Sequence, residues 1–303
     1  MKIEKSEAEP SEQISSISLK DTKSLRPFFV LFSLLGLLVI LSVLVYRLPT
    51  TNPFVKTVSF IIPFPAVMVD GSIITMRTYI LEREALAQYL KNSGTTEPPS
   101  NDVLQQTILE ALVNKTVIRK LASRYGVKLD QASVEKYYQD VVAGQSSEDD
   151  FTKELSETFG WSKTDFKKRI VESIVLALQM SDFVSKDETL QAPVREEVEQ
   201  VYGRLKAGED FLTVSATSFE NDLGYQNVAD LPEEWKVVKD LPVGVLSEII
   251  ELEQNYVIAT ITDRIEAAED SQIHLMTVMI PKITLENLVS EYLSNAKVRY
   301  FVK

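Results

Sequence analysis

The stretch PFFVLFSLLGLLVILSVLVY, residues 27–46, contains twenty residues without a charged side chain, and the rest of the chain is organised around it. At about 1.5 Å per residue, a helix of this length covers roughly the 30 Å hydrocarbon core of a bilayer. A buried core helix would carry a polar stripe, and a cleaved signal peptide would have a shorter apolar region that ends in small residues. The sequence therefore predicts a single transmembrane helix over residues 27–46.

Residues 1–26 hold five basic and five acidic side chains and few large apolar ones, which predicts a disordered tail. The chain's formal net charge of −12 therefore falls on the part that follows the tail. This acidity disfavours nucleic-acid binding, because contacts with phosphate dominate such affinity. Three basic residues precede the apolar stretch closely and two follow it, which favours a cytoplasmic N-terminus and an extracytoplasmic body.

The residue types exclude several kinds of chemistry. The chain has no cysteine, so it forms neither disulfides nor thiolate zinc sites. A serine hydrolase would need the single histidine, His274, as its base, and no Gly-x-Ser-x-Gly turn accompanies it. The acidic run 148–150 lacks a twelve-residue calcium loop, so its charges suit a helix N-terminus. We expect no metal and no cofactor.

After a proline-containing linker, residues 47–64, the body opens with PAVMVDGSIITM, residues 65–76. Asp70-Gly71 between β-branched runs predicts a β-hairpin. Apolar spacing then predicts a series of helices, with Asn101, Asp130 and Ser162 as N-caps and Gly126 and Gly160 as C-terminal stops. These helices cover residues 76–91, 101–125, 130–144, 148–159 and 162–184. In the last of them Phe166, Ile170, Ile174, Leu178 and Met180 are expected to face a core.

The hairpin, YGVKLDQASVEKYY (125–138) and FTKELSETFGWSKTDFKKRIVES (151–173) follow one another in the order of known motifs. Together they resemble the N-terminal chaperone region of SurA, PpiD and PrsA-type folding factors, with Asp70 where that family has Asn. The resemblance implies a mostly helical chaperone domain over residues 65–190. It also implies a location outside the cytoplasm and unfolded or nascent exported polypeptides as partners.

Residues 195–264 resemble the parvulin family of prolyl isomerases. The matching landmarks are LKAGEDF, the Asp222-Leu223-Gly224 turn, LPEEW, LPVGVLSE and the strand YVIATITDR. This resemblance implies a parvulin-like domain over residues 191–280, a small mixed sheet with helices. Carried across, Leu231 and Trp235 form the apolar prolyl pocket and Tyr256 adds a substrate contact. The alternative for Leu231 and Trp235 is ordinary core packing.

Prolyl isomerisation requires only an apolar pocket and a few hydrogen bonds that stabilise the twisted amide. The polar part of the family's site is incomplete here: Val257 replaces one histidine, and Glu220 is a doubtful stand-in for the central acidic group. The strand SQIHLMTVMI, residues 271–280, matches the strand that carries the family's other histidine, here His274. We therefore hypothesise a permuted first strand, in which residues 272–280 pair antiparallel with residues 255–263. Alternatively, His274 is an ordinary half-exposed strand residue.

Thr284 begins a last amphipathic helix, and residues 281–303 are expected to return to the N-terminal domain, as in SurA-like proteins. The sequence as a whole predicts an α+β fold and a chaperone or foldase in the bacterial cytoplasmic membrane, anchored in the bilayer by residues 27–46. Its isomerase activity would be weak or lost. The alternative is an active parvulin-type isomerase in which Glu220 and His274 act as catalytic residues beside Trp235. A third possibility is a structural subunit of an envelope complex.

Overall fold

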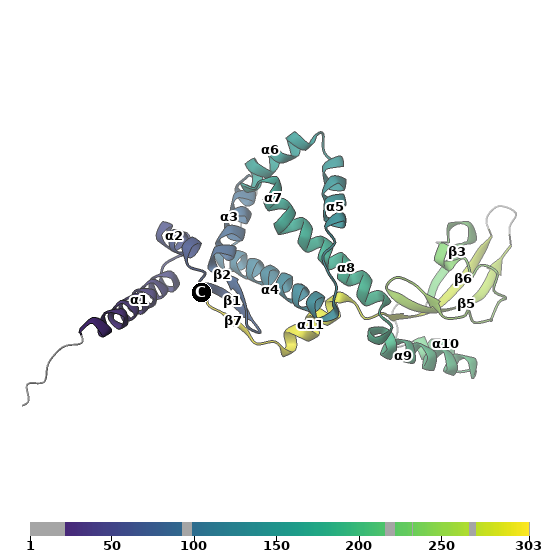
Figure 1. Cartoon of the computed structure of the whole chain (residues 1–303). Helices are drawn as coiled ribbons and strands as arrows, with labels where there is room; N and C mark the ends of the chain where they lie inside the picture. Colours follow the sequence, from purple (N-terminus) through teal and green to yellow (C-terminus); the bar gives the residue numbers. More distant parts are fainter. Residues whose placement is uncertain (1–21, 93–98, 216–221, 232, 267–270, 303) are drawn as a thin grey trace, which may run out of the picture. The chain divides into compact units, whose positions relative to one another are not determined.

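The computed structural model describes residues 22–92, 99–215, 222–231, 233–266 and 271–302. The chain divides into two compact units, residues 1–64 with residue 303, and residues 65–302. Figure 1 shows the helices and strands of both units along the chain, and each unit is described by itself.

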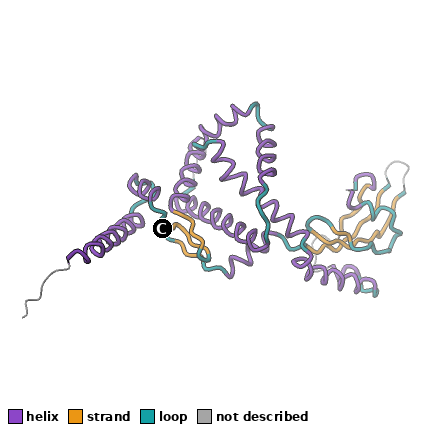
Figure 2. The backbone as a smooth tube through the Cα atoms, viewed as in Figure 1, coloured by secondary structure: helices purple, strands orange, loops and turns teal. Residues whose placement is uncertain are grey.

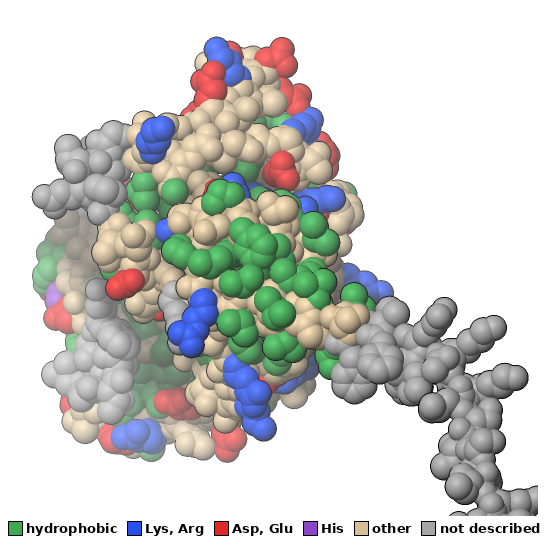
Figure 3. All heavy atoms as spheres, turned by 90° about the vertical axis from the view of Figure 1, so that its left-hand side faces the viewer, with side chains coloured by type: hydrophobic (Ala, Val, Ile, Leu, Met, Phe, Trp, Pro, Cys, Tyr) green, Lys and Arg blue, Asp and Glu red, His purple; other side chains and the backbone are tan. Residues whose placement is uncertain are grey.

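The first unit contains α1 (Thr22–Arg47) and α2 (Pro53–Ile61). The Asn52 side chain accepts a hydrogen bond from the Phe54 amide at 2.9 Å and so begins α2 inside the predicted linker. Several of the unit's apolar side chains are exposed, among them Val39, Ile40 and Ile61. Figure 3 shows hydrophobic side chains gathered on the face turned to the viewer.

Within the part of the chain that the structure describes, no helix combines the length and the apolar character needed to cross a bilayer. The prediction of a transmembrane helix over residues 27–46 is therefore wrong, and so is the single-pass membrane location that rested on it. That prediction counted only an uncharged run of residues. In the structure this run is part of a longer helix, α1, which extends from Thr22 to Arg47.

The second unit begins with the predicted hairpin, formed by β1 (Pro65–Val69) and β2 (Ser72–Thr75). Asp70 and Gly71 make the turn with positive φ angles of 43° and 80°, a conformation that Asp and Gly tolerate in a tight hairpin. On the other side of β1 lies β7 (Val298–Tyr300), so the sheet order is β2-β1-β7 and every pairing is antiparallel. The C-terminal strand thus completes the sheet that opens this unit.

Helices cover this sheet and extend away from it (Figure 1). The N-caps Asp130, Ser162 and Thr284 and the stops Gly126 and Gly160 are confirmed. One cap differs, because the Ser100 side chain, rather than that of Asn101, accepts the Val103 amide hydrogen. The helices of this part are α3 (Met76–Asn92), α4 (Asn101–Tyr125), α5 (Gln131–Ala143), α6 (Glu148–Phe159), α7 (Lys163–Phe166), α8 (Glu172–Lys186) and α11 (Leu285–Asn295).

The predicted helix over residues 162–184 is interrupted by a π-helical segment, Lys167–Val171, between α7 and α8. A π turn holds one more residue than an α turn, so it rotates every later side chain about the helix axis. The buried stripe therefore starts at Val171, the last residue of the π-helical segment, and continues through Val175, Met180 and Val184 of α8. Leu178, which the 3.6-residue period placed in the core, is 55% exposed.

The remainder of the second unit is a four-stranded sheet with α9 (Glu188–Lys206) and α10 (Phe211–Ser215). Asp187 caps α9, so the helix begins five residues before Pro193, where the sequence predicted its start. The strands are β3 (Asp222–Asn227), β4 (Ile250–Glu251), β5 (Asn255–Ile265) and β6 (Gln272–Pro281), in the order β3-β6-β5-β4.

The hypothesis that residues 272–280 pair antiparallel with residues 255–263 agrees with the register, which runs from Asn255 opposite Pro281 to Ile265 opposite Gln272. All three pairings of this sheet are antiparallel. Figure 2 shows its strands in orange. The predicted mixed sheet is therefore wrong. Since β5 and β6 are close in sequence, they pair as neighbours without the long crossover that a parallel pair requires. The described fold is α+β with two small antiparallel sheets.

Two apolar layers lie on opposite faces of this sheet. On one face, side chains of β5 and β6 such as Ile258 and Val278 pack against Val198 and Tyr202 of α9. On the other face, the alternate residues pack beneath the loop that follows β3; they include Val257, Ala259, Ile261, Ile273 and Leu275. Strand residues alternate between faces, so each predicted site residue can be assigned to one layer.

Candidate functional site

The predicted prolyl-pocket residues belong to the second of these layers. Leu231 is 9% exposed and lies in the cluster formed by Val257, Ile273 and Leu275. Trp235 ends a short 3₁₀ turn, Glu233–Trp235, and packs against the same cluster as a partly buried side chain. Both residues therefore cover the sheet as part of its core.

His274 projects from the opposite face, because its neighbours Ile273 and Leu275 both point into the layer that holds Trp235. A register shift between Ile261 and Asp263 leaves Thr262 as an extra residue in β5. The Thr262 hydroxyl lies 2.6 Å from Nδ1 of His274. His274 and Trp235 consequently do not share a cleft.

The other neighbours of His274 form a polar cluster across three strands. Nε2 of His274 lies 3.3 Å from a carboxylate oxygen of Asp222 in β3, and the ring meets that of Tyr225 edge-on at 4.9 Å. The Tyr225 hydroxyl donates to the Asp263 carboxylate at 2.5 Å. That hydrogen bond lowers the pKa of Asp263 and raises the pKa of Tyr225. Both ring nitrogens of His274 are thus engaged in contacts that join β3, β5 and β6.

Tyr256 lies on the same face as His274, at the opposite end of β5, and it is 3% exposed. Its hydroxyl accepts a hydrogen bond from Nε of Arg195 at 3.0 Å, and the Lys282 ammonium lies 5.1 Å from its ring centroid. Glu251 links the two cations, since it bonds Arg195 and Lys282 at 2.9 Å each. Tyr256 is therefore held in an ionic network within the sheet part of the unit.

Glu220, the other predicted catalytic residue, lies outside the described residues. The remaining predicted site residues lie on two faces and at two ends of the sheet, so the structure does not bring them together. The isomerase prediction required Glu220 and His274 to meet beside Trp235. The position of His274 gives no support to that arrangement.

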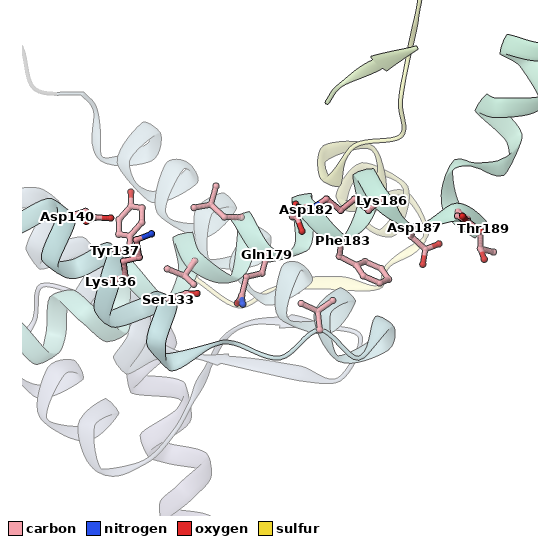
Figure 4. A pocket seen from close by; sticks show the side chains of 14 residues that line it. Ser133, Lys136, Tyr137, Asp140, Gln179, Asp182, Phe183, Lys186, Asp187 and Thr189 are labelled. Carbon is pink, nitrogen blue, oxygen red and sulfur yellow. Dashed lines mark ion pairs between the residues drawn. The ribbon is translucent and has the colours of Figure 1, made fainter. Parts of the chain in front are cut away.

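A groove that the sequence did not indicate lies between α5 and α8 (Figure 4). Its volume is about 1000 Å³, at the upper end of the range typical of ligand pockets. Its apolar side chains come from three segments and include Val127, Tyr137, Val175, Leu178 and Phe183. Leu178 is the most exposed of them, since the π-helical segment turns it away from the core. This groove is the candidate functional site.

A hydrogen bond joins the two helices of this groove, and charged side chains line it. The Gln179 side chain accepts a hydrogen bond from the Asp130 amide at 3.2 Å and so ties α8 to the start of α5. Asp182 and Lys186 form an ion pair at 2.6 Å along the groove-facing side of α8 (Figure 4). The lining carries more acidic than basic groups, with Asp140, Asp182, Asp187 and Glu188 against Lys136 and Lys186.

No protein-family model matches the chain, and the search of curated proteins found no match either.

Proposed function

We propose that the protein is a holding chaperone that binds unfolded or nascent polypeptide segments in the α5–α8 groove. The observation that carries this proposal is the exposure of Leu178 inside an open groove lined by several apolar side chains. The resemblance of residues 65–190 to the chaperone region of SurA-type folding factors supports it independently. No comparable observation supports isomerase chemistry, because His274 and Trp235 lie on opposite faces of one sheet.

The lining of the groove suits an extended polypeptide of mixed composition. Apolar side chains of a bound segment would remove Leu178 and Phe183 from water, with a gain of roughly 25 cal/mol for each Å² of apolar surface buried. The acidic excess would favour neutral or basic segments over acidic ones. Unfolded chains expose such segments, whereas folded proteins bury their apolar side chains.

The test replaces the exposed leucine by a charge, in the variant Leu178→Asp. Burying a leucine side chain contributes about 1.5–3 kcal/mol, so we expect the affinity for a permanently unfolded test protein to fall roughly 10- to 100-fold. The matched control is Val103→Asp, since Val103 is 53% exposed on α4 and is absent from the groove lining. An aspartate in the first turn of α4 also suits the helix dipole.

The assay is suppression of aggregation of a denatured protein by stoichiometric amounts of the full-length chain. The wild-type protein and Val103→Asp should suppress aggregation equally, whereas Leu178→Asp should not. Equal suppression by Leu178→Asp would contradict the proposal. Acceleration of proline-limited refolding by catalytic amounts, unchanged in Leu178→Asp, would favour the isomerase instead.

A further inference from the structure

A second cavity, of about 200 Å³, lies between α3 and α4 and is also lined by Phe159 and Trp161, at the turn between α6 and α7. Its walls are mainly apolar and include Leu86, Ile108, Leu112, Phe159 and Trp161. It is much smaller than the groove and below the usual size of a pocket for drug-sized ligands. Its volume therefore suits a group about as large as a single amino-acid residue.

Stacked aromatic rings make one wall of this cavity rigid. The Tyr89 and Phe159 rings are parallel within 1° at 5.4 Å, and Phe159 stacks on Trp161 at 4.9 Å. The Gln88 and Asn92 side chains of α3 both donate to the Glu157 carbonyl, at 2.9 and 2.8 Å, and fix the end of α6. The wall is thus formed before any ligand arrives.

Glu82 and Lys115 both line the cavity, and Arg169 beside it leaves a net positive charge next to the apolar walls. Lys115 lines the cavity, and its ammonium donates to the Arg169 carbonyl at 2.8 Å. The Arg169 guanidinium lies 4.6 Å from the Trp161 ring centroid, and its Nε bonds Glu82 at 3.2 Å. Its Nη2 is buried and has no hydrogen-bond partner among the described residues.

The electrostatics of this cluster favour an added anion. Burial lowers the pKa of Lys115 below its ordinary value, and the cations Arg119 and Arg169 act in the same direction, while Glu82 opposes them. Glu82 is already paired with Arg169, and both side chains are less than one-fifth exposed, at 19% and 18%. A negatively charged ligand group beside Lys115 would compensate the remaining positive charge.

We propose that this cavity binds the C-terminal residue of a polypeptide chain, with its apolar side chain inside the cavity and its carboxylate on the ammonium of Lys115. An apolar residue from the middle of a chain would fit the cavity but leave the positive charge uncompensated. An aspartate or glutamate side chain would bring the charge but place a polar group against the apolar walls. A free amino acid would bring an ammonium group next to the cations. The inference rests on the proposed polypeptide binding for the source of the ligand, whereas the chemistry of the cavity stands on its own.

The experiment uses the fluorescence of Trp161 in the full-length chain, with Trp235→Phe as the background, since the sequence has two tryptophans. The probes are an N-acetylated tetrapeptide that ends in leucine with a free carboxylate, and the same peptide as its amide. We expect the acid to bind at least tenfold more tightly than the amide. In Lys115→Met this preference should disappear. The preference should persist in the control Lys153→Met, because the Lys153 side chain lies on α6 and is 72% exposed.

A second variant tests the cavity without removing the charge. Ala111 lines the cavity and is exposed to solvent, so a larger side chain there should not disturb the core. Ala111→Phe should therefore preserve the fold, fill the cavity and weaken binding of the acid peptide. Equal binding of acid and amide, or a preference that survives Lys115→Met, would overturn the proposal. Tighter binding of octanoate than of the peptide acid would overturn the assignment to a chain end. Because Leu178 is outside this cavity, Leu178→Asp should leave binding of the acid peptide unchanged. This variant therefore distinguishes a failure of the cavity proposal from a failure of the proposed polypeptide binding in the α5–α8 groove.

Discussion

The most specific stability prediction concerns Gln191, which is 1% exposed and whose side-chain amide connects three segments of the second unit. Its Nε2 donates to the carbonyls of Val184 and Ile283, at 2.8 Å each, and its Oε1 accepts the Ile283 amide at 3.0 Å. Val184 lies in the last turn of α8, where carbonyls have no partner within their own helix. The side chain therefore ties the end of α8 and the segment after β6 to α9.

The variant Gln191→Leu keeps a side chain of similar size and removes all three hydrogen bonds. Each buried polar group left without a partner costs about 1–3 kcal/mol, so the low end for three groups is about 3 kcal/mol. Since 1.4 kcal/mol corresponds to a factor of ten, the protection of the Ile283 amide against hydrogen exchange should fall about 100-fold.

Native-state hydrogen exchange measured at the Ile283 amide checks this result. The control is Gln200→Leu, an exposed position on the same helix, which should change stability by no more than about 0.5 kcal/mol. Unchanged protection in Gln191→Leu, or an equal loss in both variants, would refute the reasoning that Gln191 holds these segments together.

Three further predictions concern single positions. The Lys297 amide donates to the Asp70 carboxylate at 2.8 Å and holds the pKa of Asp70 below its ordinary value. The hydrogen bond therefore stabilises the fold fully when the pH is above the ordinary pKa of Asp, and this stabilisation is lost as the pH falls through the lowered pKa. Acid unfolding followed by circular dichroism should show this loss in wild type and not in Asp70→Asn; identical pH profiles would contradict it. Gly126 has a φ of 74°, so Gly126→Ala should cost about 1–2 kcal/mol in chemical denaturation, and an unchanged midpoint would exclude the strain. Tyr225→Phe should raise the pKa of Asp263 in a carboxyl NMR titration, and no change would show that their hydrogen bond does not form.

Local chemistry made several features predictable from the sequence. Asp70-Gly71 determines the hairpin turn because these two residue types tolerate positive φ angles. Ser162 and Asp165 form a reciprocal capping box over four residues, which explains why the start of that helix was predicted correctly. Such signals depend only on neighbouring residues.

The candidate site was not predictable in this way. A π-helical segment depends on the packing around it, so the sequence period could not reveal that Leu178 turns outward into the groove. The alternation along β6 indicates that His274 lies on the opposite face from Ile273 and Leu275. It does not indicate which face Trp235 covers, because Trp235 lies in a separate loop. The transmembrane prediction rested on the composition of a single run of residues, and no helix among the described residues supports it.

The most direct test of the account is site-specific photocrosslinking from the groove of the full-length protein. A photoreactive phenylalanine analogue at position 178 is compared with the same analogue at position 103, with a defined, permanently unfolded test protein as the partner. Binding in the groove predicts efficient crosslinking from position 178, little from position 103, and competition by the same unfolded protein without label but not by a stably folded protein. Equal crosslinking from both positions, or none from position 178, would contradict it.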